Sequence, residues 1–148
     1  FKSGERGMHP EDTGGLRMYP MSLTLKRPED MQAVAAFVAA MPKVTPAHTL
    51  TGGDAARGAQ LYTICLACHG PDGGGNQAMG SPPISGQADW YLLSSLQKLK
   101  SGHRGSYPNA VVMRGMAGTL TDEQAMKDVI AHIMTLHPTN AAAAAPNQ

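Results

Sequence analysis

Apolar residues recur at helical spacing from residue 54 onward, each time behind a residue that can cap a helix. The first stretch begins at Asp54 and runs into a pair of cysteines, and the second begins at Asp89 and stops at Gly102. The third opens at Thr121 with Asp122 and Glu123, and one of its faces carries Met126, Val129, Ile130, Ile133 and Met134. Because Asp and Thr side chains accept hydrogen bonds from first-turn amides, the pattern predicts three helices that begin at these three positions.

The segments between the predicted helices are rich in Gly and Pro, at 70–75, 80–86 and 102–108. No segment alternates between apolar and polar residues as a half-buried strand does. The expected fold class is therefore all-α with long loops. Loops of this length make a domain of about 85 residues marginal unless something cross-links it, so we expect a large cofactor around which they wrap.

The positions of prolines and of stretches rich in Gly, Thr or Ala predict that the chain has four parts. Residues 1–46 form a first segment, 47–53 a linker, 54–138 a compact domain, and 139–148 an Ala-rich flexible tail. The first segment repeats the end of the compact domain. Met18, Met21, Leu25 and Met31 match Met113, Met116, Leu120 and Met126 at identical spacing. We therefore interpret residues 1–46 as a partial duplicate of the domain that lacks a cysteine pair.

Composition narrows the class of protein. The 148 residues are 42% hydrophobic and 16% charged with a net charge of +1, which predicts a folded chain and excludes a nucleic-acid binder. The longest uncharged apolar run, 33–41, is too short to span a bilayer. Membrane association would thus require a further segment or a partner. The chain begins at Phe1 without a leader, so we expect a processed protein or a fragment of a longer one.

Cys65, Cys68 and His69 have the spacing of a c-type haem attachment site. Two thiols about one helical turn apart can bond to the two vinyl groups of one porphyrin, and the adjacent imidazole then reaches the iron. A zinc site would need two further ligands, and the chain has no second cysteine pair. A redox dithiol would sit between a strand and a helix, and a disulfide is the weakest use of this spacing. The motif therefore predicts one covalently bound haem c.

A six-coordinate iron needs a second axial ligand, and a soft thioether would raise the reduction potential. Met113 and Met116 are the best placed of the ten methionines, with Met113 preferred, because they follow a loop and precede the closing helix. Met79 is a weaker candidate. Histidine is the alternative ligand type, with His103 ahead of His132, which we expect to be a partly buried helix residue.

Several motifs resemble those of class I cytochromes c. Residues 54–58, 65–69 and 70–73 look like the amino-terminal part of that family. Pro-Pro-Ile-Ser-Gly-Gln at 82–87, Trp-Tyr-Leu-Leu at 90–93, and residues 99–102, 113–116 and 120–123 are similar to cytochrome c4-like proteins. Those proteins are di-haem electron carriers made of two tandem c domains. The resemblance covers the central region densely and the first segment in part, and it implies a cytochrome c fold.

The resemblance also implies roles for particular residues. Met113 would be the iron ligand, and the carbonyl of Pro82 would hold the other ring nitrogen of His69. Gly58 and Tyr62 would form the contact between the first and last helices, where the family usually has an aromatic residue at the position of His132. Met18 would be the ligand of a second haem if the chain is the later part of a di-haem protein.

Two strong axial ligands leave no open iron position, which disfavours enzymatic chemistry and favours single-electron transfer. The resemblance implies partners such as a quinol-oxidising complex and a terminal oxidase or dehydrogenase, in a respiratory-type chain in the bacterial periplasm. Two alternatives stay open: a cytochrome subunit or domain of a larger dehydrogenase or oxidase complex, and a catalytic or sensing haem protein with a labile sixth ligand.

Overall fold

The computed structural model describes residues 1–42, 44–105 and 108–137, and the predicted flexible tail lies outside them. All regular elements in these residues are helices, so the all-α prediction is confirmed. The α-helices are α1 (Thr13–Leu23), α2 (Pro28–Ala40), α3 (Ala55–Leu61), α4 (Leu66–His69), α5 (Asp89–Ser101), α6 (Pro108–Thr119) and α7 (Glu123–Ile133). Two short 3₁₀ turns, η1 (Tyr62–Ile64) and η2 (Gln77–Met79), join them.

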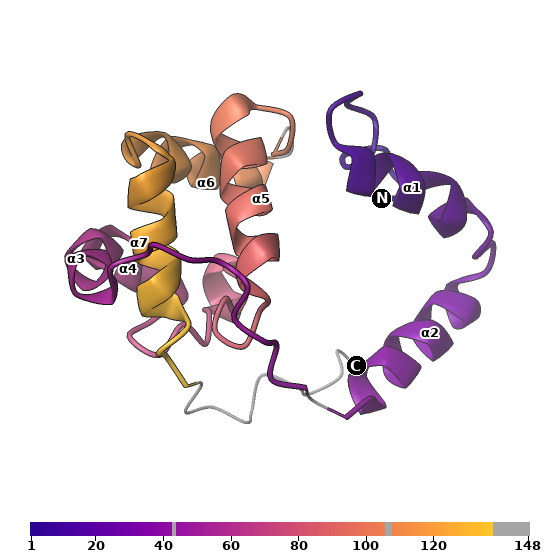
Figure 1. Cartoon of the computed structure of the whole chain (residues 1–148). Coiled ribbons are helices and arrows are strands. Elements are labelled where there is room, and N and C mark those ends of the chain that lie inside the picture. Colours follow the sequence, from indigo (N-terminus) through magenta and orange to yellow (C-terminus); the bar gives the residue numbers. More distant parts are fainter. Residues whose placement is uncertain (43, 106–107, 138–148) are drawn as a thin grey trace.

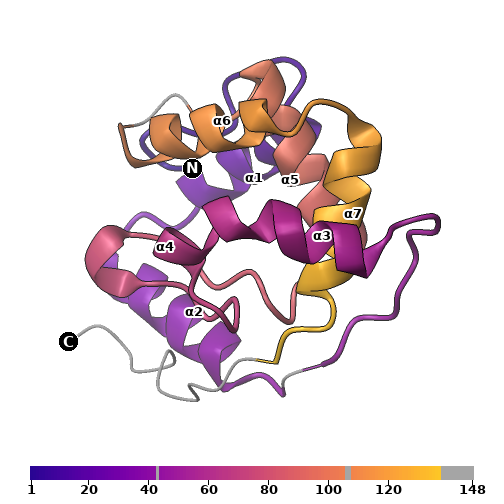
Figure 2. The same cartoon turned by 90° about the vertical axis from the view of Figure 1, so that its left-hand side faces the viewer.

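Helices α3 to α7 form one bundle, while α1 and α2 lie to one side of it (Figure 1). Within the bundle α3 packs against α7, and α5 packs against both α6 and α7. Figure 2 shows α3 crossing α7, with α6 running above it. Helix α6 was not predicted, because its glycines at 115 and 118 resemble loop residues. Pro108 at its first position is the signal that indicates a helix start.

The helix starts differ in detail from the sequence prediction. Asp54 caps α3 as expected, and its side chain accepts hydrogen bonds from the amides of Ala56 and Arg57. The start of α5 is wrong by one residue, because Ala88 rather than Asp89 is its cap. Helix α7 is capped by Asp122, the second residue of the predicted start at 121–123. An error of one residue is of the size that helix ends ordinarily show.

Asp89 is buried because it binds the linker instead of capping its own helix. Its carboxylate accepts hydrogen bonds from the amide of Thr49 at 2.5 Å, from the Thr49 hydroxyl at 2.6 Å and from the amide of Leu50 at 2.9 Å. Burial would raise the pKa of Asp89, but these hydrogen bonds outweigh it and lower the pKa from 3.8 to about 2.

The hydrophobic core lies where α7 meets α3 and α5. The predicted apolar face of α7 is confirmed, because four of its five residues are buried and Met134 packs against them. The core residues are Tyr62, Leu92, Leu120, Ala125, Met126, Val129, Ile130 and Ile133. A Cβ at Gly58 would overlap the backbone of Asp128 and lie 3.0 Å from the Cβ of His132. Only glycine therefore lets α3 approach α7 so closely.

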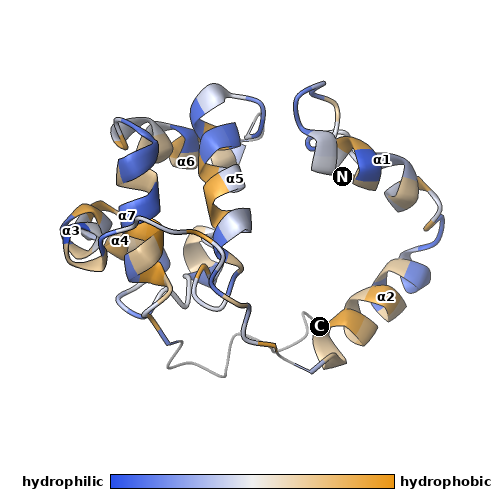
Figure 3. Ribbon diagram, viewed as in Figure 1, coloured by the Kyte–Doolittle hydropathy of each residue, from blue (hydrophilic) through white to orange (hydrophobic). Residues whose placement is uncertain are grey.

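The first segment follows the register of the predicted repeat. Adding 95 to the first residue of α1 and of α2 gives the first residue of α6 and of α7. Unlike α7, however, α2 buries none of its side chains although it is largely apolar, as Figure 3 shows. No helix of the described residues is long and apolar enough to cross a membrane.

Gly58→Ala should lower the free energy of unfolding by roughly 1–3 kcal/mol, because the added methyl group forces α3 and α7 apart. Gly118→Ala is the matched control, since a Cβ there meets nothing within 4 Å. It should raise stability by about 0.5–1 kcal/mol through helix propensity. Guanidinium unfolding followed by circular dichroism measures the free energy of unfolding of both variants. An equal change in the two variants would contradict the close crossing of α3 and α7.

Asp89→Asn should lower the free energy of unfolding by roughly 1.5–3 kcal/mol, since it weakens charge-assisted hydrogen bonds to the linker. A lowered folded-state pKa stabilises the fold above the unfolded-state pKa of 3.8 and loses that stabilisation as the pH falls toward about 2. The difference between wild type and variant should therefore shrink below pH 3.8. The exposed Asp30→Asn, which breaks a pair with Arg27, should cost under about 1 kcal/mol.

Candidate functional site

The cysteine motif is presented by the short helix α4. The amide of Cys68 donates to the carbonyl of Cys65 at 3.2 Å, and the amide of His69 donates to the same carbonyl at 2.9 Å. These bonds turn both cysteines and His69 toward one cavity, which all three side chains line. The helix ends at Gly70, whose φ of 77° is a conformation that favours glycine.

The ring of His69 is held by the loop that contains Pro82. Its Nδ1 lies 2.9 Å from the carbonyl oxygen of Pro82, at hydrogen-bond distance, and its side chain is buried. Gly75 allows this approach: its φ is 82°, and a Cβ there would lie 2.6 Å from the carbonyl oxygen of Ser81. The hydroxyl of Tyr62 donates to the carbonyl of Gly70 at 2.8 Å. The loop around His69 is thus fixed from both sides.

The cavity in front of His69 has a volume of about 480 Å³. Its wall is mostly apolar and comes from α4, α5, α6, α7 and the loop at 79–87. Met113, Met116 and Met79 all line it, with Met113 half-buried and Met79 more than half exposed. The two histidine alternatives lie elsewhere. His103 stacks on His9 with ring centroids 4.5 Å apart, and His132 packs on Tyr62 at 5.2 Å.

The cysteines carry no disulfide, so that alternative is not what the structure shows. Burial raises the pKa of Cys65, and the neighbouring Cys68 raises it further. Among the described residues no group of three or more His, Cys, Asp and Glu side chains could hold a metal ion by itself.

The model of the cytochrome c family matches residues 55–137, which is more than half of the chain. The chain belongs to the cytochrome c family. It is a class I c-type cytochrome related to cytochrome c4. It is 38% identical to cytochrome c4 of Azotobacter vinelandii over 96 residues, which cover 62% of this chain and 45% of that protein. It is 40% identical to cytochrome c-554(548) of Halomonas halodenitrificans over 80 residues, which cover 54% of this chain and 93% of that protein.

A solved structure shares the fold of this cytochrome. Cytochrome c4 of Acidithiobacillus ferrooxidans superimposes with a TM-score of 0.70 at 22% identity, over 91% of this chain and 77% of that one. The chain is also 32% identical to the cbb3-type cytochrome c oxidase subunit CcoP of Rubrivivax gelatinosus, over 89% of this chain and 41% of that subunit. The cytochrome spans about half the length of the first two cytochrome c4 relatives.

Haem c is the covalent cofactor of this cytochrome. The residues present fit the group. The apolar cavity has both thiols and an imidazole in one wall, and the imidazole is already hydrogen-bonded through the nitrogen that would face away from iron. The haem supplies an iron that cycles between two oxidation states. The chain supplies its attachment, its orientation and its apolar surroundings.

Most residues of the cavity wall were not named as site residues from the sequence, and two of them carry large polar side chains. Arg104 and Tyr91 line the cavity, although neither was named as a site residue. A signal existed for Arg104, because Gly102-His103-Arg104-Gly105 repeats as Gly4-Glu5-Arg6-Gly7 in the first segment. Tyr91 was assigned only to the apolar face of a helix, and sequence spacing alone does not separate a core position from a cofactor contact.

Gly75→Ala should displace the Pro82 carbonyl from His69 and cost roughly 1–3 kcal/mol of stability. It should also raise the reduction potential, because an imidazole without its outer hydrogen bond donates less charge to ferric iron. Gly86→Ala is the matched control: its φ of 76° imposes the same backbone strain, but a Cβ there meets nothing within 4 Å. If potentiometric titration gave the same potential for both variants, Gly75 would not support His69.

Proposed function

We propose that this chain is a single-electron carrier whose haem is bonded to Cys65 and Cys68 and ligated axially by His69 and Met113. The observation that carries the proposal is the convergence of these four side chains on one cavity from two helices far apart in sequence. The carbonyl of Pro82 is the partner of His69 that orients its ring. The chain is then an electron-transfer protein and not an enzyme.

The roles of these residues follow from their chemistry. A bond from Nδ1–H of His69 to the Pro82 carbonyl fixes the tautomer in which Nε2 carries the free lone pair. The thioether of Met113 is a soft ligand that favours ferrous iron and raises the potential. If His69 and Met113 both bind the iron, no position would be left on it for a substrate, and the haem would supply a one-electron redox centre.

The electron carrier would work in a respiratory-type chain in the periplasm. Its partners would be a quinol-oxidising complex as donor and a terminal oxidase or dehydrogenase as acceptor. Within residues 54–137 six basic side chains balance six acidic ones, so attraction between net charges contributes little to docking. Docking then depends on a small contact around the haem edge, as is typical of transient redox complexes.

Residues 1–46 belong, in this proposal, to a second cytochrome c-like unit, followed by a linker at 47–53 and the haem domain at 54–138. Two observations support it: α1 and α2 begin in the same register as α6 and α7, and the side chains of α2 are exposed where those of α7 are buried. Met18 on α1 then stands where Met113 stands on α6. A protein in which this unit is complete would carry a second haem.

Met113→Ala should remove the methionine–iron charge-transfer band of the oxidised protein and lower its reduction potential, because the soft sixth ligand is lost. Visible spectroscopy and potentiometric titration measure the two effects on the haem-loaded chain.

Met116→Ala is the matched control, since Met116 lines the same cavity one helical turn later and is more exposed. Met116→Ala should keep the methionine–iron charge-transfer band and should change the reduction potential only slightly. Loss of the band in Met116→Ala but not in Met113→Ala would move the assignment to Met116. A band unaffected by either variant would contradict methionine ligation from α6.

A second candidate function is that of a cytochrome subunit or domain of a larger oxidase or dehydrogenase complex. The similarity to the cbb3 oxidase subunit over 89% of this chain favours it. Size-exclusion chromatography of the native protein from its source distinguishes the two roles. A free electron shuttle elutes at the size of the cytochrome alone, whereas a subunit of a complex co-elutes with haem-containing partner proteins.

A further inference from the structure

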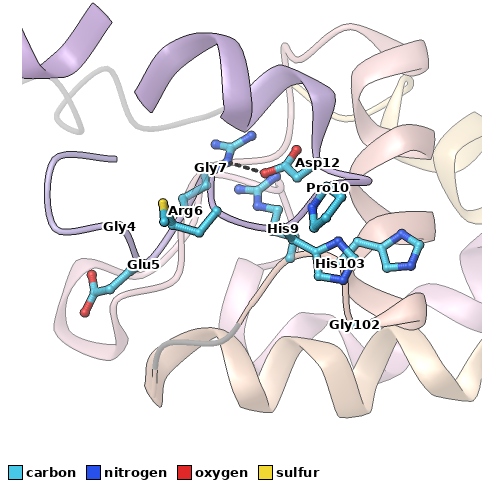
Figure 4. Close-up of a pocket in the computed structure, with 11 residues that line it drawn as sticks. Gly4, Glu5, Arg6, Gly7, His9, Pro10, Asp12, Gly102 and His103 are labelled. Carbon is cyan, nitrogen blue, oxygen red and sulfur yellow. Dashed lines mark ion pairs between the residues drawn. The ribbon is translucent and has the colours of Figure 1, made fainter. Parts of the chain in front are cut away.

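Two stacked histidine rings join the first segment to the haem domain. His9 lies in the loop at 4–12, and His103 lies in the turn that follows α5. Their ring centroids are 4.5 Å apart, with an angle of 21° between the ring planes (Figure 4). Both rings line a cavity of about 280 Å³ between the loop and the turn. His9 is exposed and His103 is half-buried, so protons from the solvent can reach both rings.

The loop at 4–12 uses the neutral form of His9. The amide of Glu11 donates to Nδ1 of His9 at 3.1 Å, which requires that this nitrogen carry no proton. In the imidazolium form both ring nitrogens are donors, so protonation of His9 breaks this hydrogen bond. The amide of Asp12 donates to the carbonyl of His9 at 3.0 Å, and Asp12 caps α1. A change of charge at His9 therefore reaches the start of α1.

The buried carboxylate of Asp12 is the second link between the two parts. It lies 2.9 Å from Nζ of Lys98 on α5 and 3.6 Å from Nε of Arg6. Burial raises the pKa of Asp12, but hydrogen bonds from Lys98 and from an amide of α1, with the charges of Lys98 and Arg6, outweigh it, and the pKa is lowered. Asp12 therefore stays ionised between roughly pH 5 and 8, the range in which histidine ordinarily changes its charge.

Positive charge predominates around the two rings. The charged groups that surround them come from the loop at 4–12, the turn at 102–105, α5 and α6. They are the cations Arg6, Arg104, Lys98 and Arg114 and the carboxylates of Glu5, Glu11 and Asp12. Asp12 already pairs with two of the cations. Protonation of both rings would add two positive charges to a place that has an excess of them.

We propose that the stacked rings of His9 and His103 are an acid-sensitive latch, which holds the first segment on the haem domain while both rings are neutral and loosens when both are protonated. Like charges at this distance repel each other, and the hydrogen bond from the Glu11 amide is lost in the same step. The hydrophobic core of the haem domain contains no residue of the first segment, so that core stays closed. The turn at 102–105 also contributes to the wall of the haem cavity, and loosening of the latch exposes that part of the wall to water.

Hydrogen exchange of the haem-loaded full chain near pH 8 and near pH 5 tests the proposal. Protection of the amides at 9–16, corrected for the intrinsic exchange rate at each pH, should fall about tenfold at the lower pH. Protection of α7 should stay the same at both pH values. His48→Gln is the matched control, because it removes an exposed histidine of the linker, and it should keep the full fall.

Two variants remove the charge change from the stacked pair. His9→Asn places an uncharged side chain that can still accept a hydrogen bond from the amide two residues further on. His103→Gln places a planar, uncharged amide against the ring of His9. In each variant only one imidazole of the pair still titrates, or none faces another charge of its kind, so protection of the amides at 9–16 should fall by less than about twofold.

Each outcome bears on the latch. Equal protection of the amides at 9–16 at both pH values in the wild type would overturn it. A fall as large in His9→Asn and His103→Gln as in the wild type would assign the effect to other groups, and a fall lost in only one variant would contradict the stacked pair as the sensor. Loss of protection in α7 together with residues 9–16 would show acid unfolding of the whole domain instead.

The latch does not depend on the proposed haem site. A chain that lacks covalent haem by intact mass would contradict that site, and the exchange experiment on the latch would stand as described. If His103→Gln does not fold, the comparison of His9→Asn with His48→Gln decides by itself.

Discussion

The crossing of α3 and α7 at Gly58 is the constraint on which the rest of the haem domain depends. Because no side chain separates the two helices at Gly58, Tyr62 at the end of α3 is buried in the core. Helix α4 follows Tyr62 closely in the chain. Tyr62 then hydrogen-bonds the carbonyl of Gly70, the residue that ends α4 behind His69. The position of the haem-binding motif is thus set by backbone contact between the first and last helices of the bundle.

The bundle leaves a cavity because its loops are held apart rather than packed against one another. The glycines at 70 and 75 reverse the chain around His69, and the loop at 79–87 forms one wall while α5 and α6 form the others. The low aromatic content of 5% fits such a design. The bulk that aromatic side chains usually supply to a core comes in this family from the porphyrin.

The first segment contacts the haem domain through charged and ring side chains and not through an apolar helix face. Its helices keep the register of α6 and α7, yet α2 buries no side chain in the described structure. The segment is bound to the haem domain instead by the buried Asp12, which pairs with Lys98 of α5 and with Arg6 of its own segment, and by the stacking of His9 on His103. A buried carboxylate is tolerated only when cations lie beside it. This contact therefore fixes which surfaces of the two parts meet, whereas a purely apolar contact would allow several arrangements.

The sequence by itself determined the elements whose signals are local: the cysteine motif with His69, the cap at Asp54, the apolar face of α7 and the equal spacing of the repeats. The approach of Pro82 to His69 was anticipated only through family resemblance, because nothing local in the chain joins residues 13 positions apart. Helix α6, the linker contacts of Asp89 and the ion pair of Asp12 with Lys98 were decided by the tertiary structure. The contacts between side chains join residues 39 or more positions apart, and α6 depends on burial that compensates for its glycines. A short window of sequence contains no information about either.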